Sequence, residues 1–207
     1  MSDMPKSRFL IVAIALIAAV FSPRYSKADV IFSQTGTPSG HFTETSTEFW
    51  AQSFTVGSSA EVLTTVDVSL FPGSPSGQFF VDLYSNNAGS PGTMLEALTG
   101  NNNPSGGTET YTSSGSSLSA NTTYWIVQGI SSGGGFQYWN EENNNSPEVG
   151  SSIGAKFSFD SGASWSLQPG FSMQMVVNGT EAVPEPSTIW ASLSAAVGML
   201  VLRRRRK

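Results

Sequence analysis

The side chains that could perform acid–base chemistry are few in this sequence. His41 is the only histidine among the 207 residues, and Glu141 and Glu142 are the only adjacent carboxylates. A Ser-His-Asp triad would depend on His41, which lies in a polar stretch where a lone histidine is typically solvated. A glycoside hydrolase needs two carboxylates about 5 to 10 Å apart, whereas neighbours in a strand face opposite sides. We therefore expect no catalytic site and no enzyme.

Oxygen-bearing side chains gather in the acidic loop expected at residues 140–148. Its possible calcium ligands are Asn143, Asn144, Asn145 and Glu148. These residues lack the D-x-[DN]-x-[DN]-G spacing of a calcium loop. Cysteine is absent, so zinc sites, thiolate nucleophiles and disulfides are excluded. We expect no metal and no cofactor, and a structural calcium ion in this loop stays as the alternative.

Aromatic residues are the most plausible binding feature. Phe136, Tyr138 and Trp139 follow a glycine-rich turn, and Trp165 lies in a small-residue stretch. Exposed rings could stack on sugar faces, whereas buried rings would belong to the core. Tyr138, Trp139 and Trp165 are thus candidate sugar-binding residues, provided that they form an exposed, roughly coplanar patch beside polar groups.

Short strands must position these residues, because apolar and polar residues alternate repeatedly between the two ends of the chain. Turn-forming stretches rich in Gly, Pro and Asn separate the strands. We expect an all-β fold, an antiparallel β-sandwich of jelly-roll-like size with eight or nine strands. The segments with strand character are 50–56, 66–70, 79–83, 123–130, 157–159 and 171–177.

The charge distribution limits the partners of this domain. Residues 29–183 contain thirteen carboxylates and one cation, Lys156, which gives a net charge of −12. Nucleic-acid binding requires clustered cations. We therefore expect no nucleic-acid partner.

Residues 1–28 have the layout of a signal peptide. Lys6 and Arg8 precede the almost wholly apolar residues 9–21, and small residues stand at the −3 and −1 positions before Asp29. Thirteen apolar residues are fewer than the roughly 20 of a membrane-spanning helix, which argues against the alternative of an uncleaved anchor. We expect cleavage between Ala28 and Asp29, and an extracytoplasmic domain over residues 29–183.

Residues 184–207 combine three elements in a fixed order. Pro184, Glu185 and Pro186 favour an extended segment that an enzyme could grip. A hydrophobic helix is expected over residues 188–202, of which residues 189–202 span about 21 Å. Although short for a bilayer core of roughly 30 Å, this helix predicts a membrane anchor. The basic tip would hold the end in the cytoplasm; it consists of Arg203, Arg204, Arg205, Arg206 and Lys207.

This tail resembles the PEP-CTERM sorting signal of Gram-negative bacteria. The resemblance covers about 24 residues and implies recognition by an exosortase, a membrane cysteine transpeptidase-like enzyme. It further implies cleavage near Pro184-Glu185-Pro186 and release or transfer to the cell surface. The family is associated with bacteria that make exopolysaccharide and biofilm matrix. A plain tail anchor with incidental prolines is the alternative.

A second resemblance lies between the two ends. Residues 51–56 (AQSFTV), 80–93 (FVDLYSNNAGSPGT) and 118–125 (LSANTTYW) are similar to the bacterial surface domain called choice-of-anchor R, over about residues 49–177. That domain occurs with alternative C-terminal anchors and has no known activity. The resemblance implies a surface location and leaves the ligand open.

These observations predict a non-catalytic, exported cell-surface or extracellular-matrix protein that an exosortase sorts and processes. Its C-terminal helix would anchor it in the inner membrane before processing. The alternative is a carbohydrate-binding module for exopolysaccharide, or, less favoured, a glycoside hydrolase.

Overall fold

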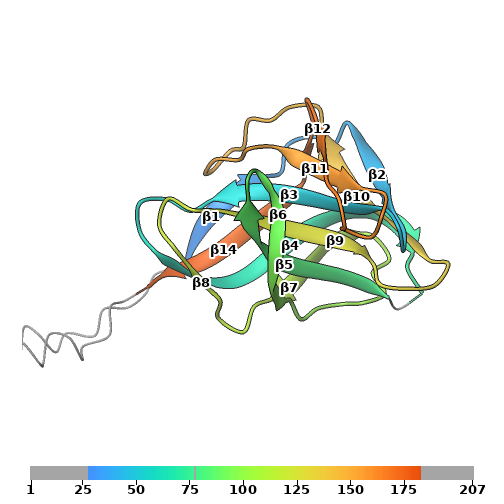
Figure 1. The fold of residues 1–207 in the computed structure, drawn as a ribbon, viewed down its shortest axis with the longest axis horizontal. Coiled ribbons are helices and arrows are strands. Elements are labelled where there is room, and N and C mark those ends of the chain that lie inside the picture. Colours follow the sequence, from blue (N-terminus) through green and yellow to red (C-terminus); the bar gives the residue numbers. More distant parts are fainter. Residues whose placement is uncertain (1–27, 77, 183–207) are drawn as a thin grey trace, which may run out of the picture. The chain divides into compact units, whose positions relative to one another are not determined.

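The computed structural model describes residues 28–76 and 78–182, which fall within one compact unit. This part of the chain is all-β and its paired strands are antiparallel, which confirms the all-β, antiparallel part of the expected fold (Figure 1). The expected signal-peptide helix and transmembrane helix lie outside the described residues. Within the described ranges, no helix has the length and hydropathy needed to cross a membrane.

Sheet A has eight strands, and the long strand β4 links most of them. β4 pairs with β14 and β10 and also with β7 and β8, while β1 pairs with β14 and β2 pairs with β10. The strands of sheet A are β1 (Ala28–Gln34), β2 (Gly40–Glu44), β4 (Glu61–Ser74), β7 (Gly107–Thr112), β8 (Ser117–Leu118), β10 (Phe136–Glu142), β13 (Ser172–Met173) and β14 (Met175–Glu181).

Sheet B has six strands in the order β12-β11-β3-β9-β5-β6. The turn between β5 and β6 has positive φ at both Ala88 (49°) and Gly89 (80°), as a two-residue hairpin with the strand twist requires. The strands of sheet B are β3 (Phe49–Thr55), β5 (Phe79–Asn87), β6 (Ser90–Ala97), β9 (Thr123–Ile130), β11 (Ala155–Ser158) and β12 (Ser166–Gln168).

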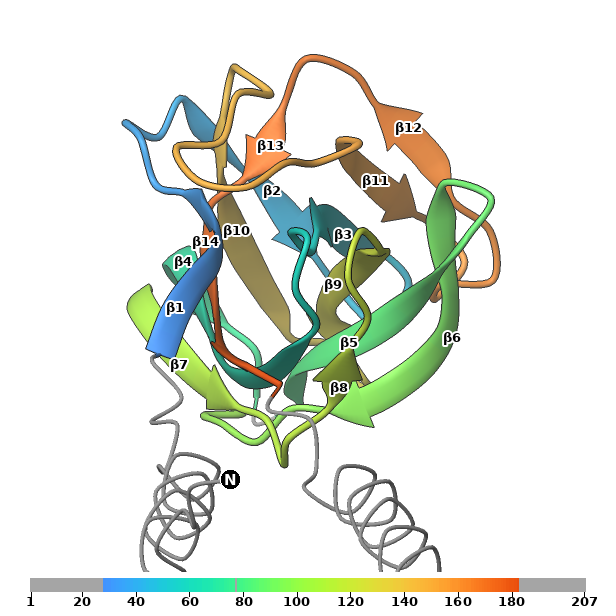
Figure 2. The same ribbon diagram turned by 90° about the vertical axis from the view of Figure 1, so that its left-hand side faces the viewer.

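The main core lies between the inner faces of the two sheets, which follows from the alternating pattern. Val66, Val68 and Leu70 of β4 are buried in one cluster with Phe79 and Val81 of β5. The predicted strands at residues 66–70, 79–83 and 123–130 are thus confirmed. The two sheets, seen edge-on in Figure 2, enclose this core.

Two details of the predicted strands differ in the structure. The described residues contain fourteen strands in place of eight or nine, because several have only two or three residues and carry no periodic signal. Phe159 lies beyond the end of β11 and is 66% exposed. Its spacing from Phe157 matched a strand, but the chain turns after Ser158.

The outer face of sheet B carries a second, smaller core. Ala51, Trp125 and Val127 are fully buried there, under four half-buried rings: Phe49, Phe80, Tyr84 and Trp165. Lys156 of β11 donates from Nζ to the Ser90 hydroxyl of β6 at 2.9 Å, so the start of β6 reaches back across this face. Nearly every residue of β9 is buried because both of its faces are covered.

Glu96 of β6 fastens the loop between β7 and β8. Its carboxylate accepts hydrogen bonds from the Ser113 hydroxyl (2.7 Å), the Ser116 hydroxyl (2.5 Å) and the Ser114 amide. Partial burial opposes ionisation, but the hydrogen bonds outweigh it and lower the pKa of Glu96 from 4.5 to about 2. The ionised carboxylate therefore stabilises the fold above pH 4.5.

A Glu96→Gln variant is expected to lose about 1 kcal/mol of unfolding free energy at neutral pH, because a neutral amide is a weaker acceptor. The difference from wild type should shrink as the pH falls from 4.5 towards 2, where Glu96 becomes protonated in the folded state as well. Urea unfolding at several pH values measures this. A difference that stays constant with pH would contradict the role of the ionised carboxylate.

Candidate functional site

The two ends of the described domain lie next to each other on sheet A. Ala28 pairs with Thr180 and Asp29 with Gly179, where β1 runs beside β14. The last hydrogen bond before the tail joins the Ala182 amide to the Ala60 carbonyl at 2.9 Å. Ala28 and Asp29, the expected cleavage residues, are exposed. The sorting motif, Pro184, Glu185 and Pro186, and the basic tip at residues 203–207 lie outside the described residues.

Two shallow depressions lie on the surface of the described domain. One, of about 590 Å³, is lined by uncharged residues that include Ser85, Asn121 and Tyr124. The other, of about 410 Å³, contains the carboxylates of Asp29 and Glu61. Burial and then repulsion by Asp29 and Glu181 raise the pKa of Glu61. This acidic depression lies where the chain enters the domain, and His41 borders neither depression.

The adjacent carboxylates of Glu141 and Glu142 belong to strand β10 and are buried, with 6% and 2% exposure. Glu142 accepts hydrogen bonds from the side-chain amides of Gln34 (2.8 Å), Gln174 (2.9 Å) and Asn144 (3.0 Å). Burial raises the pKa of Glu141, partly offset by Ser39 and His41. Neither carboxylate lines the depressions described above. Glu142 joins β10 to β1 and to the link between β13 and β14.

The acidic loop expected at residues 140–148 is partly a strand, because β10 continues to Glu142. Its possible calcium ligands are engaged by different partners. Glu148 accepts from the Thr35 amide at 2.9 Å, and Asn145 accepts from the Ser172 hydroxyl at 2.9 Å. Within residues 28–76 and 78–182, no group of three or more His, Asp or Glu side chains is arranged to hold a metal ion.

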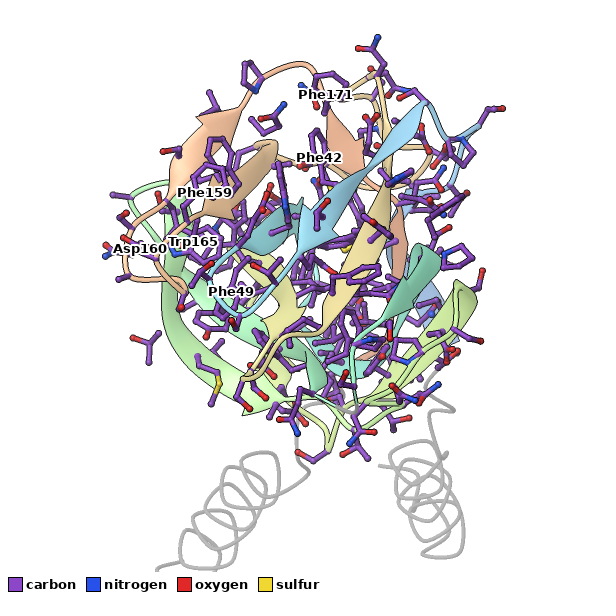
Figure 3. The ribbon with its side chains drawn as sticks, turned by 90° about the vertical axis from the view of Figure 1, so that its right-hand side faces the viewer. Phe42, Phe49, Phe159, Asp160, Trp165 and Phe171 are labelled. Carbon is purple, nitrogen blue, oxygen red and sulfur yellow. The ribbon has the colours of Figure 1, made fainter. Side chains whose placement is uncertain are left out.

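The structure separates the three aromatic residues that the sequence suggested for sugar binding. Trp139 has no exposed surface, and its indole Nε1 donates to the Gln174 carbonyl at 2.8 Å. Trp165 is half-buried in the outer core of sheet B, near Phe49 (Figure 3). Tyr138 lies on the outer face of sheet A. The expected three-ring patch therefore does not exist, because alternation along β10 turns Trp139 inward and Tyr138 outward.

Trp165 is positioned by the loop that joins β11 to β12. Asp160 accepts hydrogen bonds from the Ser158 hydroxyl (2.7 Å), the Ser164 amide (2.8 Å) and the Ser164 hydroxyl (2.6 Å). These hydrogen bonds, chiefly from Ser164 and Ser158, lower the pKa of Asp160 to about 2. Asp160 thus holds the loop closed and has a structural role.

Tyr138 belongs to a different group of rings, here called the sheet A ring cluster: His41 of β2, Phe71 of β4, and Phe136 and Tyr138 of β10. The His41 and Phe71 rings are stacked, with centroids 4.4 Å apart and planes 4° apart. Tyr138 meets His41 edge-on at 4.7 Å, and Phe136 lies 5.3 Å from Tyr138. Phe71 is 46% exposed, Phe136 is 38% exposed and His41 is exposed.

Sequence reasoning overlooked Phe71 and treated His41 only as a solvated residue. The available signal was the alternation in β4, which points Asp67, Ser69 and Phe71 to the same side. The contact between His41 and Phe71 joins residues 30 positions apart, through the pairing of both β2 and β4 with β10. That pairing carries no local signal.

A row of hydrogen-bonding side chains adjoins the sheet A ring cluster on the same face. Asn140 donates to the Ser69 hydroxyl at 2.9 Å. Asp67 accepts from the Thr110 hydroxyl at 2.6 Å and from the Asn178 amide at 3.1 Å. This face thus offers rings at one end of β4 and hydroxyl, amide and carboxylate groups along the rest of it.

Two comparisons with known proteins found no match for this chain. No protein-family model matches the chain, and no curated protein matches it. The sequence signals at both ends and the geometry of the described domain are therefore the basis for assigning a function.

Proposed function

We propose that this chain is an exported, non-catalytic cell-surface or extracellular-matrix protein, processed by an exosortase at its C-terminal signal. In this proposal a signal-peptide helix precedes a jelly-roll-like sandwich, and a hydrophobic helix follows it. The chain is held in the inner membrane until the tail is cut, and then passes to the surface or matrix of a Gram-negative bacterium.

One observation carries this proposal: the stretch between the two expected cuts, residues 29–183, contains all of the fourteen described strands except Ala28. Strand β14 ends at Glu181, so Pro184-Glu185-Pro186 follows within three residues. Cleavage between Ala28 and Asp29 would remove one residue of β1. Processing at both ends would thus leave the core intact and would remove only Ala28 from the sheets. The structural role of Glu142 favours a non-catalytic domain over a glycoside hydrolase.

The test uses a variant in which Pro184, Glu185 and Pro186 are all changed to alanine. It is produced in a Gram-negative host that contains an exosortase. Fractionation and intact mass spectrometry then compare the variant with wild type. We expect wild type to have lost the signal peptide and the tail, which together account for residues 1–28 and about residues 184–207, and to reach the surface or medium. The variant should keep its tail and stay in the membrane fraction.

A Ser187→Ala variant serves as the matched control, since it changes the residue next to the motif and should be processed normally. Wild type that retains the full tail would overturn the exosortase proposal and support the plain tail anchor. A motif variant with the same mass and location as wild type would likewise overturn recognition of Pro184-Glu185-Pro186 by an exosortase.

A further inference from the structure

The outer face of sheet A combines accessible rings with oriented polar groups. We propose that it binds neutral sugar units of a polysaccharide, with Phe71, His41 and Tyr138 as the stacking rings. This inference deepens the carbohydrate-binding alternative by giving it a site and a ligand class. It is independent of the proposed sorting, because a domain can bind glycan whether or not its tail is cut.

The rings of this face are held in place and remain accessible. His41 and Phe71 support each other by stacking at 4.4 Å, and Phe71 nevertheless keeps 46% of its surface exposed. One side of the stacked pair is therefore accessible. Tyr138 fixes the pair from the side, with its ring at 66° to His41. Rings held in place by neighbours lose little conformational entropy when a ligand binds.

A row of polar side chains continues from the rings along β4. Thr65, Asp67, Ser69 and Phe71 follow one another at two-residue steps on one face of β4, so they extend over about 20 Å. Asn178 donates to Thr65 at 3.0 Å, and Asn140 donates to Ser69 at 2.9 Å. Hydroxyls used as acceptors in this way can still donate to a ligand. Sugars present apolar C–H faces and hydroxyl edges, and this face offers partners for both.

Charge selects the class of glycan. Lys156 is the only cation in residues 29–183, and it belongs to sheet B, where it is bonded to Ser90. The polar row contains one carboxylate, that of Asp67. None of the described residues that form the row is a cation. With a net charge of −12, this domain repels uronate, sulfate and phosphate groups. A neutral polysaccharide meets no such repulsion.

The geometry favours a glycan over a protein partner. In the sheet A ring cluster and the polar row beside it, only Phe71 and Phe136 are exposed large hydrophobic residues. Thr65, Asp67 and Ser69 continue this face of β4 with polar side chains. A stable protein interface typically needs about 800 Å² per partner around a buried apolar centre, which two rings do not supply.

The test is affinity electrophoresis of the full chain in mild detergent. Native gels contain neutral polysaccharides (hydroxyethylcellulose, xylan, galactomannan or dextran) or the acidic polysaccharide alginate. We expect at least one neutral gel to retard wild type. The basic tip at residues 203–207 of the full chain attracts alginate, so in alginate we expect wild type and Phe71→Ala to have the same mobility. Phe71→Ala should weaken retardation about tenfold, which corresponds to about 1.4 kcal/mol, and His41→Ala should weaken it to a lesser degree.

Phe159→Ala is the matched control, because Phe159 is an exposed ring outside sheet A and its removal should leave retardation unchanged. Circular dichroism and thermal unfolding confirm that each variant is folded. The proposal is overturned if no neutral gel retards wild type, if Phe71→Ala changes the mobility in alginate as much as in the neutral gels, or if Phe71→Ala binds the neutral polysaccharides like wild type. Light scattering that shows a Phe71-dependent dimer, without retardation in any neutral gel, would assign this face to a second copy of the chain.

Discussion

We expect a Trp139→Ala variant to lose about 3–5 kcal/mol of unfolding free energy, a large part of the stability of a domain of this size. Trp139 is fully buried in the main core, beside Phe42 of β2 and Leu70 of β4 in the strand register. Its removal leaves a cavity and deprives the Gln174 carbonyl of the indole donor. Urea unfolding followed by circular dichroism measures the loss.

A milder change keeps this prediction testable if the alanine variant does not fold. Trp139→Phe retains an aromatic ring but removes the donor, so we expect a loss of about 1–2 kcal/mol. Trp165→Ala, at a half-buried ring, should cost less than Trp139→Ala. Folded Trp139→Phe protein should bind neutral polysaccharide like wild type. A loss of less than about 1 kcal/mol in Trp139→Ala would contradict its place in the core.

The second large effect concerns Glu44, which is fully buried and whose two carboxylate oxygens have no hydrogen-bond partner. It lies opposite Gln137 in the pairing of β2 with β10. Burial, and then the nearby charge of Glu48, raise the pKa of Glu44 well above its ordinary value of 4.5. The Glu44 carboxyl group therefore stays protonated to a higher pH in the folded protein than in the unfolded chain.

The sign of the pH effect follows from that difference. Stability from protonated Glu44 is fully present below pH 4.5 and is lost as the pH rises towards the raised pKa of the folded state. A Glu44→Met variant has a side chain of similar length and no proton to lose. At about pH 8 we expect it to be about 1–3 kcal/mol more stable than wild type.

Unfolding titrations from about pH 5 to about pH 8 test this prediction. Asp82, whose pKa burial raises to about 6, titrates in the same range, so the informative quantity is the difference between wild type and variant. Glu109→Met, at a partly exposed strand position, is the control for replacing a glutamate with methionine. The prediction is contradicted if the free energy of unfolding of wild type does not fall relative to that of Glu44→Met as the pH rises. The Glu44 carboxylate would then have a partner in the folded protein.

The strands with one buried face were predictable because their alternation is a local property of the chain. Strand β4 shows this, with valine and leucine inward and aspartate and serine outward. Strand β10 was not predictable, because it places Gln137, Trp139 and Glu141 inward and aromatic residues on both faces. Because polar residues point inward and both faces are mixed, β10 has no period-two hydrophobic pattern. The sequence therefore did not determine which of its rings are buried and which are exposed.

The sequence by itself determined the net charge of the domain, the absence of cysteine and the strands with clean alternation. It also contained the signals at both ends on which the proposed export depends. Only the tertiary structure decided that Trp139 is core, that Glu142 is a structural acceptor and that His41 meets Phe71. The physical reason is that each of these states depends on pairing between strands distant in sequence, and burial and stacking arise only when those strands come together.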